Sequence, residues 1–196
     1  MSTSDVALRD RILGEATRLF VANGYNGISM REIAEAVGVS KAGLYYHFKD
    51  KQDLFLAILT DDLSAIAQIV AAARAAGGTT RAQVARVVRE LFAQPPERRA
   101  IVRLAGQELD NLDEAARAEF GRRYYERFIG QIAALLQEGI ARGELRQRDP
   151  QALTWLLLGM MYPYFYPAHT GNKPLPATTI EAVTSIFLNG IQQPVA

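Results

Sequence analysis

The most informative absence in this 196-residue chain is cysteine. Without a thiol the protein can form no disulfide bond, thiol redox sensor or thiolate metal site. Histidine is also scarce, since His47 and His169 are the only two, and no other metal-binding side chain lies near His169 at a ligand spacing. The chain has no nucleophile elbow, no phosphate-cradling glycine loop and no zinc-ligand helix motif. We therefore expect that the protein is not an enzyme and that it holds no bound metal or cofactor.

Long hydrophobic runs are missing as well. The N-terminal residues MSTSDVALRD contain no apolar core of the kind that a signal peptide needs. Residues 152–165 are mostly apolar, but this run is too short to span a membrane and contains Pro163. These features predict a cytoplasmic protein without a membrane partner.

An excess of charge of one sign is absent too. The formal net charge is +1, and residues 1–53 carry seven basic and seven acidic side chains. A nucleic-acid-binding domain usually shows a basic excess, so this balance argues against one. Residues 39–52 are a local exception, because three lysines face a single aspartate there.

Residues 28–51 contain the most specific pattern in the chain. Ser29, with Glu32 three residues later, forms a capping box that starts a helix. Gly38 can take the positive φ at which helices end, and Ser40 can cap a second helix. The small or apolar residues that would face inward are Ile33, Ala34, Val37, Val39, Leu44 and Phe48. This spacing predicts a helix-turn-helix, and the alternative is an ordinary corner of an all-helical protein.

Aromatic and basic side chains surround the inward positions of the second helix, namely Lys41, Tyr45, Tyr46, His47, Lys49 and Lys51. Such groups are costly on a plain surface but can contact the sugars, phosphates and base edges of DNA. The segment resembles the DNA-binding domain of the tetracycline-repressor (TetR/AcrR) family of bacterial regulators. The resemblance rests on Phe20, Gly24, Tyr25, Ser29, Ile33, Ala34, Val37, Gly38, Val39, Ser40, Leu44, Tyr45, His47, Phe48, Lys51 and Leu54. Its most specific part is the string VSKAGLYYHFKDKQDL.

The resemblance implies a homodimer that binds a palindromic operator in double-stranded DNA, most often as a repressor released by a small-molecule inducer. Base edges would be approached by Lys41, Ala42 and Gly43, and a base or sugar by Tyr45. Phosphates would be held by Ser29, Ser40, Tyr46, His47 and Lys51. A purely structural role is the alternative for His47. Because Gly43 has no side chain, the operator would be read partly through DNA shape.

The remaining chain also has helical periodicity and shows neither sustained alternation nor an internal repeat. Helices are predicted at about 5–22, 51–76, 80–93, 97–109, 114–142, 150–166 and from Thr178 or Thr179 to about 189, with a Gly/Pro loop at 167–176. The predicted fold is all-α with about nine helices. A helix-turn-helix DNA-binding domain would occupy residues 1–50, and a helical bundle for ligand binding and dimerisation residues 51–196.

The helix predicted at 150–166 is apolar on every side, so it must be buried on every side. A chain of this size can hardly surround it, and we expect one face of it to meet a second subunit together with the last helix. The alternative is one large core within a single chain.

Aromatic rings concentrate in the middle of the chain, as in a small-molecule site between bundle helices. The candidate ligand contacts are Phe92, Leu104, Glu108, Tyr124, Tyr125, Phe128, Trp155 and Tyr162. They predict a small, largely apolar or aromatic inducer, although each ring could instead be core and Glu108 could lie on a solvated face. Two other classes stay open: a helical small-molecule-binding protein without DNA binding, and a helical enzyme with Glu108 as its base.

Overall fold

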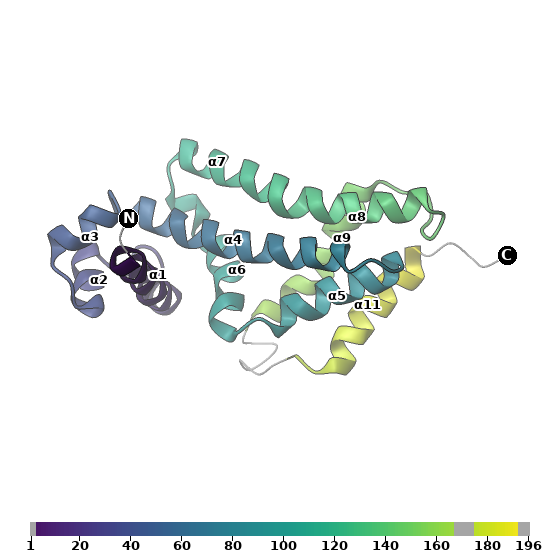
Figure 1. Cartoon of the computed structure of the whole chain (residues 1–196), viewed down its shortest axis with the longest axis horizontal. Helices are drawn as coiled ribbons and strands as arrows, with labels where there is room; N and C mark the ends of the chain where they lie inside the picture. Colours follow the sequence, from purple (N-terminus) through teal and green to yellow (C-terminus); the bar gives the residue numbers. More distant parts are fainter. Residues whose placement is uncertain (1–2, 167–174, 192–196) are drawn as a thin grey trace. The chain divides into compact units, whose positions relative to one another are not determined.

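The computed structural model describes residues 3–166 and 175–191, which contain helices, turns and short connections but no β-strand (Figure 1). The helices are α1 (Thr3–Asn23), α2 (Met30–Val37), α3 (Lys41–His47), α4 (Lys51–Ala75), α5 (Thr80–Ala93), α6 (Pro96–Glu108), α7 (Glu114–Tyr124), α8 (Gly130–Ala141), α9 (Pro150–Met161) and α11 (Ala177–Ile191). The predicted all-α class is confirmed. His169 and most of the predicted Gly/Pro loop lie outside the described residues.

Three short segments of other helix types adjoin these helices: the 3₁₀ turn η1 (Leu109–Asn111) follows α6, the π-helical turn η2 (Tyr125–Ile129) joins α7 to α8, and the 3₁₀ turn η3 (Tyr162–Phe165) follows α9. Because η2 joins α7 directly to α8, the helix predicted at 114–142 is one rod with a π-turn inside it (Figure 1). The last helix begins at Ala177 rather than at Thr178 or Thr179, directly after Pro176.

The chain folds as two compact units. One is formed by the residues up to Asp62 together with Ala100–Phe120, and the other by Leu63–Arg99 together with the residues from Gly121 onward. The chain crosses between the units three times, after Asp62 in α4, after Arg99 in α6 and after Phe120 in α7. Each of these junctions lies inside a helix rather than in a loop. The functional division predicted at residue 50 stays a prediction.

In the first unit, α1 packs on α2 and α2 packs on α3. Three aromatic rings form the centre of this unit: Phe55 lies edge-on to Phe20 and Tyr25, with ring centroids 5.4 Å and 5.1 Å away. The other large, fully buried side chains of this unit include Ile12, Ile33, Leu44, Phe48 and Leu54. Burying each of these contributes about 1.5–3 kcal/mol relative to leaving it exposed.

In the second unit, α8 packs against α5 and α9, and α11 packs against α5 and α9. Polar bonds tie helix ends together here: Arg74 of α4 bonds to Gln131 and Glu138 of α8. By length and composition alone α4 could cross a membrane, but the core helix of a globular protein passes the same test. Its buried residues include Leu54, Phe55, Ile58, Leu59, Leu63, Val70 and Ala73.

Candidate nucleic-acid interface and ligand-binding residues

The start of α2 is fixed by the predicted capping box. The Ser29 hydroxyl accepts a hydrogen bond from the Glu32 amide, and the Glu32 carboxylate accepts one from the Ser29 amide at 2.8 Å. Hydrogen bonds from the Ser29 side chain and backbone lower the pKa of the Glu32 carboxyl. The start of α2 is therefore held by hydrogen bonds within residues 29–32.

The turn between α2 and α3 has the predicted geometry. Gly38 takes φ 76°, and its amide and that of Val39 donate to the carbonyls of Glu35 and Ala34. Ser40 then caps α3 by accepting a bond of 3.0 Å from the Gly43 amide. A Cβ on Gly43 would lie 3.3 Å from the Ser40 hydroxyl oxygen, so glycine at this position leaves room for the cap.

The outer face of α3 is open to solvent, as the sequence predicts. Lys41 and Ala42 are exposed at the start of the helix, and Tyr45 and Tyr46 are exposed further along, Tyr46 by 76%. The Lys41 ammonium lies 5.7 Å from the centre of the Tyr45 ring. Leu44, on the opposite face, is fully buried. The recognition surface, defined as Lys41, Ala42, Tyr45 and Tyr46, thus stands on an apolar base.

Two of the predicted phosphate ligands have their polar atoms engaged inside the protein. The Nε2 of His47 lies 3.5 Å from a carboxylate oxygen of Asp5 in α1, and only 6% of the His47 side chain is exposed. The Lys51 ammonium donates to the backbone carbonyls of Tyr25 and Ile28. A helical pattern does not reveal these contacts, because the partners of His47 and Lys51 lie 23 to 42 residues away in the sequence.

The link between α3 and α4 is held by two carboxylates. Asp50 caps α4 by accepting a bond of 2.8 Å from the Asp53 amide. Asp53 in turn accepts a bond of 3.0 Å from the Lys49 amide. The second bond, from the amide one residue before the cap, was not predicted from the sequence. The three-residue link therefore has little freedom.

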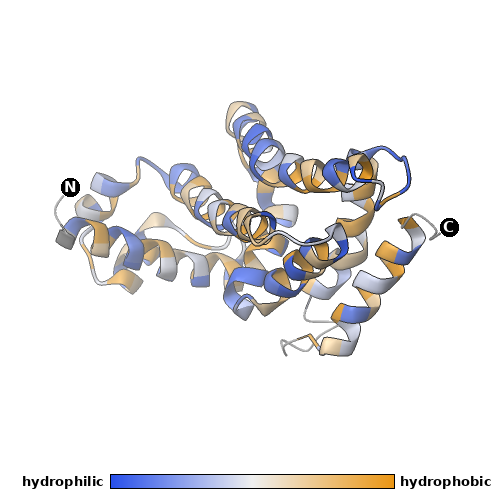
Figure 2. Cartoon of the chain, turned by 45° about the vertical axis from the view of Figure 1, so that its right-hand side comes forward, coloured by the Kyte–Doolittle hydropathy of each residue, from blue (hydrophilic) through white to orange (hydrophobic). Residues whose placement is uncertain are grey.

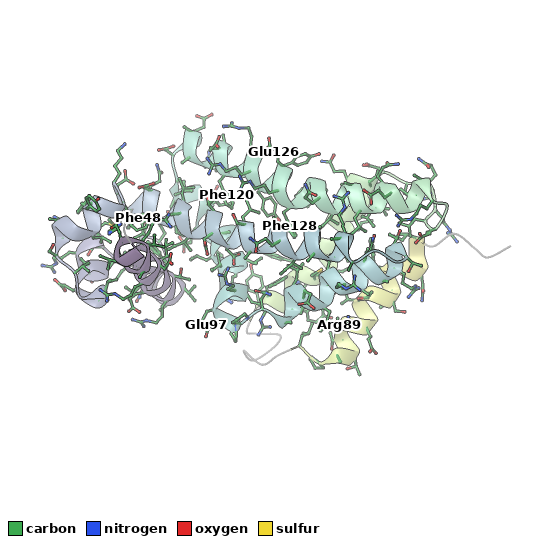
Figure 3. All side chains as sticks on the ribbon, in the orientation of Figure 1. Phe48, Arg89, Glu97, Phe120, Glu126 and Phe128 are labelled. Carbon is green, nitrogen blue, oxygen red and sulfur yellow. The ribbon has the colours of Figure 1, made fainter. Side chains whose placement is uncertain are left out.

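Several of the predicted ligand contacts belong to the second unit and have aromatic neighbours there. Phe92 is buried beside Phe165 and Tyr164, with ring centroids 5.3 Å and 6.2 Å away. Tyr124 lies edge-on to Phe128 at 5.6 Å, and burial raises the pKa of its hydroxyl. Figure 3 shows Phe128 and Glu126 on opposite sides of the α7–α8 rod, and Phe128 is the buried one. Tyr164 and Phe165 are not among the ligand contacts that the sequence predicts.

Tyr162 lies edge-on to Tyr166, with ring centroids 5.3 Å apart. Its hydroxyl and that of Tyr166 lie 2.7 Å apart. This hydrogen bond, with burial and the nearby Tyr166 and Tyr124, raises the pKa of Tyr162 to about 12. The Tyr162 hydroxyl therefore keeps its proton at neutral pH.

Of the other four predicted contacts, two are exposed and two belong to the first unit. Trp155 and Tyr125 are exposed by 48% and 46%, and the Tyr125 hydroxyl donates to Gln151 of α9. Leu104 and Glu108 belong to the first unit, where the Glu108 carboxylate accepts a bond of 2.7 Å from Asn111. A helix that is apolar all round does not indicate which face lies inside, so the exposure of Trp155 could not be predicted from the sequence.

Both parts of the chain match known domains. Residues 12–58 match the family described as "Bacterial regulatory proteins, tetR family", and residues 74–186 match the "Tetracyclin repressor-like, C-terminal domain". The second match alone covers more than half of the chain. The chain belongs to the TetR family. This family consists of bacterial regulatory proteins rather than enzymes.

Individual TetR-family relatives are similar mainly in the N-terminal region. The regulator QacR of Staphylococcus aureus is 54% identical over 52 residues, which are 26% of this chain and 28% of QacR. The repressor AcnR of Corynebacterium diphtheriae is 38% identical over 72 residues, which are 36% of this chain and 38% of AcnR. The chain thus spans less than half the length of these curated relatives.

A solved structure covers nearly the whole chain. AibR, crystallised with isovaleryl coenzyme A and operator DNA, superposes with a TM-score of 0.72 over 96% of this chain and 100% of its own, at 24% identity. At this identity the likeness shows the fold.

Proposed function

We propose that this protein is a homodimeric DNA-binding transcriptional regulator that acts as a repressor. Its affinity for its operator responds to a small molecule. The observation that carries the proposal is the exposed recognition surface on a capped helix-turn-helix. Membership of a family of bacterial regulatory proteins supports it, as does the operator-bound structure of AibR.

The recognition surface is suited to a major groove. Lys41 can reach guanine at the start of α3, and Ala42 can contact a thymine methyl group. Tyr45 can contact a base or a sugar and Tyr46 a phosphate, and the Ser29 and Ser40 caps lie at helix N-termini, where backbone amides attract phosphate. His47 and Lys51 have internal partners, so we assign them no direct base contact. With so few side chains on the bases, operator shape would carry part of the specificity.

The second copy would cover the exposed apolar face of α9 and α11. On α9, Trp155 and Leu156 are exposed by 48% and 60%, and on α11 Ile186 is exposed by 66%. Small exposed residues accompany them at helical spacing, namely Ala152, Gly159, Ala182 and Gly190. Figure 2 shows α11 largely in orange and pale shades. A second copy would bury these side chains and place two recognition helices on one duplex.

The inducer would bind among the aromatic residues of the second unit, around Phe92, Tyr124, Phe128 and Tyr162. Buried rings favour an apolar or aromatic body, and tyrosine hydroxyls supply hydrogen bonds that fix its orientation. Because α4 contributes residues to both units, a ligand that favours one position of α4 would alter DNA affinity. A coupling of about 1–3 kcal/mol corresponds to about a five- to 150-fold change.

The proposal is tested by fluorescence anisotropy with the DNA upstream of the protein's own gene, at about 150 mM salt. We expect Tyr45→Ala and Lys41→Ala each to weaken binding about tenfold or more, in line with about 1–3 kcal/mol for a good base contact. Arg89→Ala, an exposed change on α5, is the matched control and should bind like the wild type.

Two results would contradict the proposal. If neither variant loses affinity, α3 is not the reading element. If the wild type shows no sequence preference at all, the chain is instead a helical small-molecule-binding protein without DNA-binding activity.

A further inference from the structure

The ammonium group of Lys51 lies in a small cage made by one turn of the chain. It donates hydrogen bonds of 2.9 Å to the carbonyl of Tyr25 and 3.1 Å to that of Ile28. It also lies 4.5 Å from the centre of the Tyr25 ring, a position that favours a cation. An ammonium group has three donors, so most of its bonding capacity is used inside the protein.

This cage joins the two ends of the helix-turn-helix. Tyr25 and Ile28 precede Ser29, which caps α2, and Lys51 is the first residue of α4. The cage therefore closes residues 25–51 into a loop that contains both α2 and α3. The Tyr25 ring extends the connection, because it lies edge-on to Phe55, one turn further along α4.

The remaining connection between α3 and α4 is also fixed. The Lys49 amide bonds to Asp53, and the Asp53 amide bonds to Asp50. With the cage on one side and these caps on the other, α4 cannot turn against α3 without breaking hydrogen bonds on both sides.

We infer that Lys51 is a positioning residue, which fixes the recognition helix to α4 through Tyr25, rather than a ligand of a DNA phosphate. The inference rests on the proposed function and names the joint through which a movement of α4 reaches α3. It differs from the role that family resemblance gives to Lys51. Lys41 offers the contrast, because its side chain is exposed on the recognition surface.

Salt dependence separates the two roles, because removing one lysine that neutralises a phosphate lowers the slope of log K against log salt by about 0.9. Binding of the full-length protein to its upstream DNA is measured from 50 to 300 mM KCl for the wild type and Lys51→Met. We expect Lys51→Met to bind about tenfold more weakly with an unchanged slope. A slope that falls by about 0.9 in Lys51→Met would overturn the inference, and so would unchanged affinity.

Lys51→Arg serves as a second variant that retains the charge. Arginine is at least as good a phosphate ligand as lysine, but its planar guanidinium has a different shape and donor geometry from the ammonium that the two carbonyls and the ring hold. We expect Lys51→Arg to bind more weakly, as Lys51→Met does. Wild-type affinity in Lys51→Arg would contradict a positioning role.

A double-mutant cycle tests the cage without DNA. Tyr25→Leu removes the ring but keeps the carbonyl, and Tyr25→Phe keeps both. We expect the decreases in thermal stability of Lys51→Met and Tyr25→Leu to be less than additive when combined, because both remove the same interaction. Tyr25→Phe should leave the effect of Lys51→Met unchanged. Strict additivity in the Tyr25→Leu cycle would refute the cage, whereas a wild type that ignores DNA would refute only the proposed function.

Discussion

Polar side chains in the first unit show how a residue's role depends on the distance to its partner. Ser29, Ser40 and Asp50 act as the caps that their sequence context predicts, since each bonds to an amide three residues away. Lys51 and His47 have partners 23 to 42 residues away, in segments that only the fold brings close. Local capping could therefore be predicted from the sequence, and these two side-chain roles could not.

The Glu32 carboxylate makes the stability of α2 depend on pH. Its folded-state pKa is lowered by the bonds from Ser29, so its contribution is present above the unfolded value near 4.5 and is lost as the pH falls through the folded value. We expect wild type to melt above Glu32→Gln at pH 7 and the difference in Tm to shrink towards pH 3. Melting curves across this range provide the check, and a constant difference would contradict the role of charge.

Gly139 of α8 is in close contact with α5. A Cβ on Gly139 would lie 2.3 Å from the Thr80 hydroxyl oxygen, and Thr80 is fully buried. We expect Gly139→Ala to lower the free energy of unfolding by about 1–3 kcal/mol, as overpacked cores do. Denaturant titration measures this decrease.

Gly14→Ala is the matched control for this prediction. A Cβ on Gly14 of α1 would meet no atom within 4 Å. Alanine there should raise the free energy of unfolding by about 0.5–1 kcal/mol, because glycine costs backbone entropy in a helix. Destabilisation of both variants by the same amount would show that crowding at Thr80 is not the cause.

At the scale of elements, the π-turn η2 is the feature that periodicity did not predict. Its Gly130 amide bonds to the Tyr125 carbonyl five residues earlier, so the turn contains one residue more than an α-helix would. An insertion of this kind leaves the apolar pattern on both sides intact, and the sequence therefore resembled one continuous helix. The ends of this rod, at Asp113 and Gly143, were predictable because capping and positive φ are local properties.

The π-turn makes one deletion much milder than another. Removal of exposed Glu126 should convert η2 into a regular α-helical turn while α7 and α8 keep their buried faces. Removal of exposed Gln137 should rotate the end of α8 by about 100° and move Ile140 out of the core. We expect the first variant to retain its helical circular dichroism and cooperative melting and the second to lose both. Equal damage from the two deletions would show that η2 does not contain the extra residue.

At the scale of the whole molecule, the exposed apolar side chains of α9 and α11 bear on the proposed dimer. A carboxylate introduced in the centre of an apolar interface loses its hydration without gaining a partner. We expect Trp155→Glu and Ile186→Glu each to be monomeric by analytical ultracentrifugation and to bind operator DNA at least tenfold more weakly. Arg89→Glu, at an exposed position of α5, is the control and should stay dimeric.

If Trp155→Glu remained dimeric, the interface between the two copies would have to lie elsewhere on the protein. The large exposed side chains themselves could be expected from a helix that is apolar all round, but which of them stay exposed could not. Trp155 was expected among the ligand contacts because the sequence does not indicate that Leu153 and Leu157, rather than Trp155, face the core.

The passages of α4, α6 and α7 between the two units have a further consequence. None of the three junctions, at residues 62, 99 and 120, is a loop, so a protease that needs an extended, unfolded substrate finds no site there. Limited digestion should spare these positions, and neither half of the protein should be obtainable as a stable fragment. A different ligand-binding domain could then be fused to the first unit only if it supplied the parts of α4, α6 and α7 that belong to the second unit.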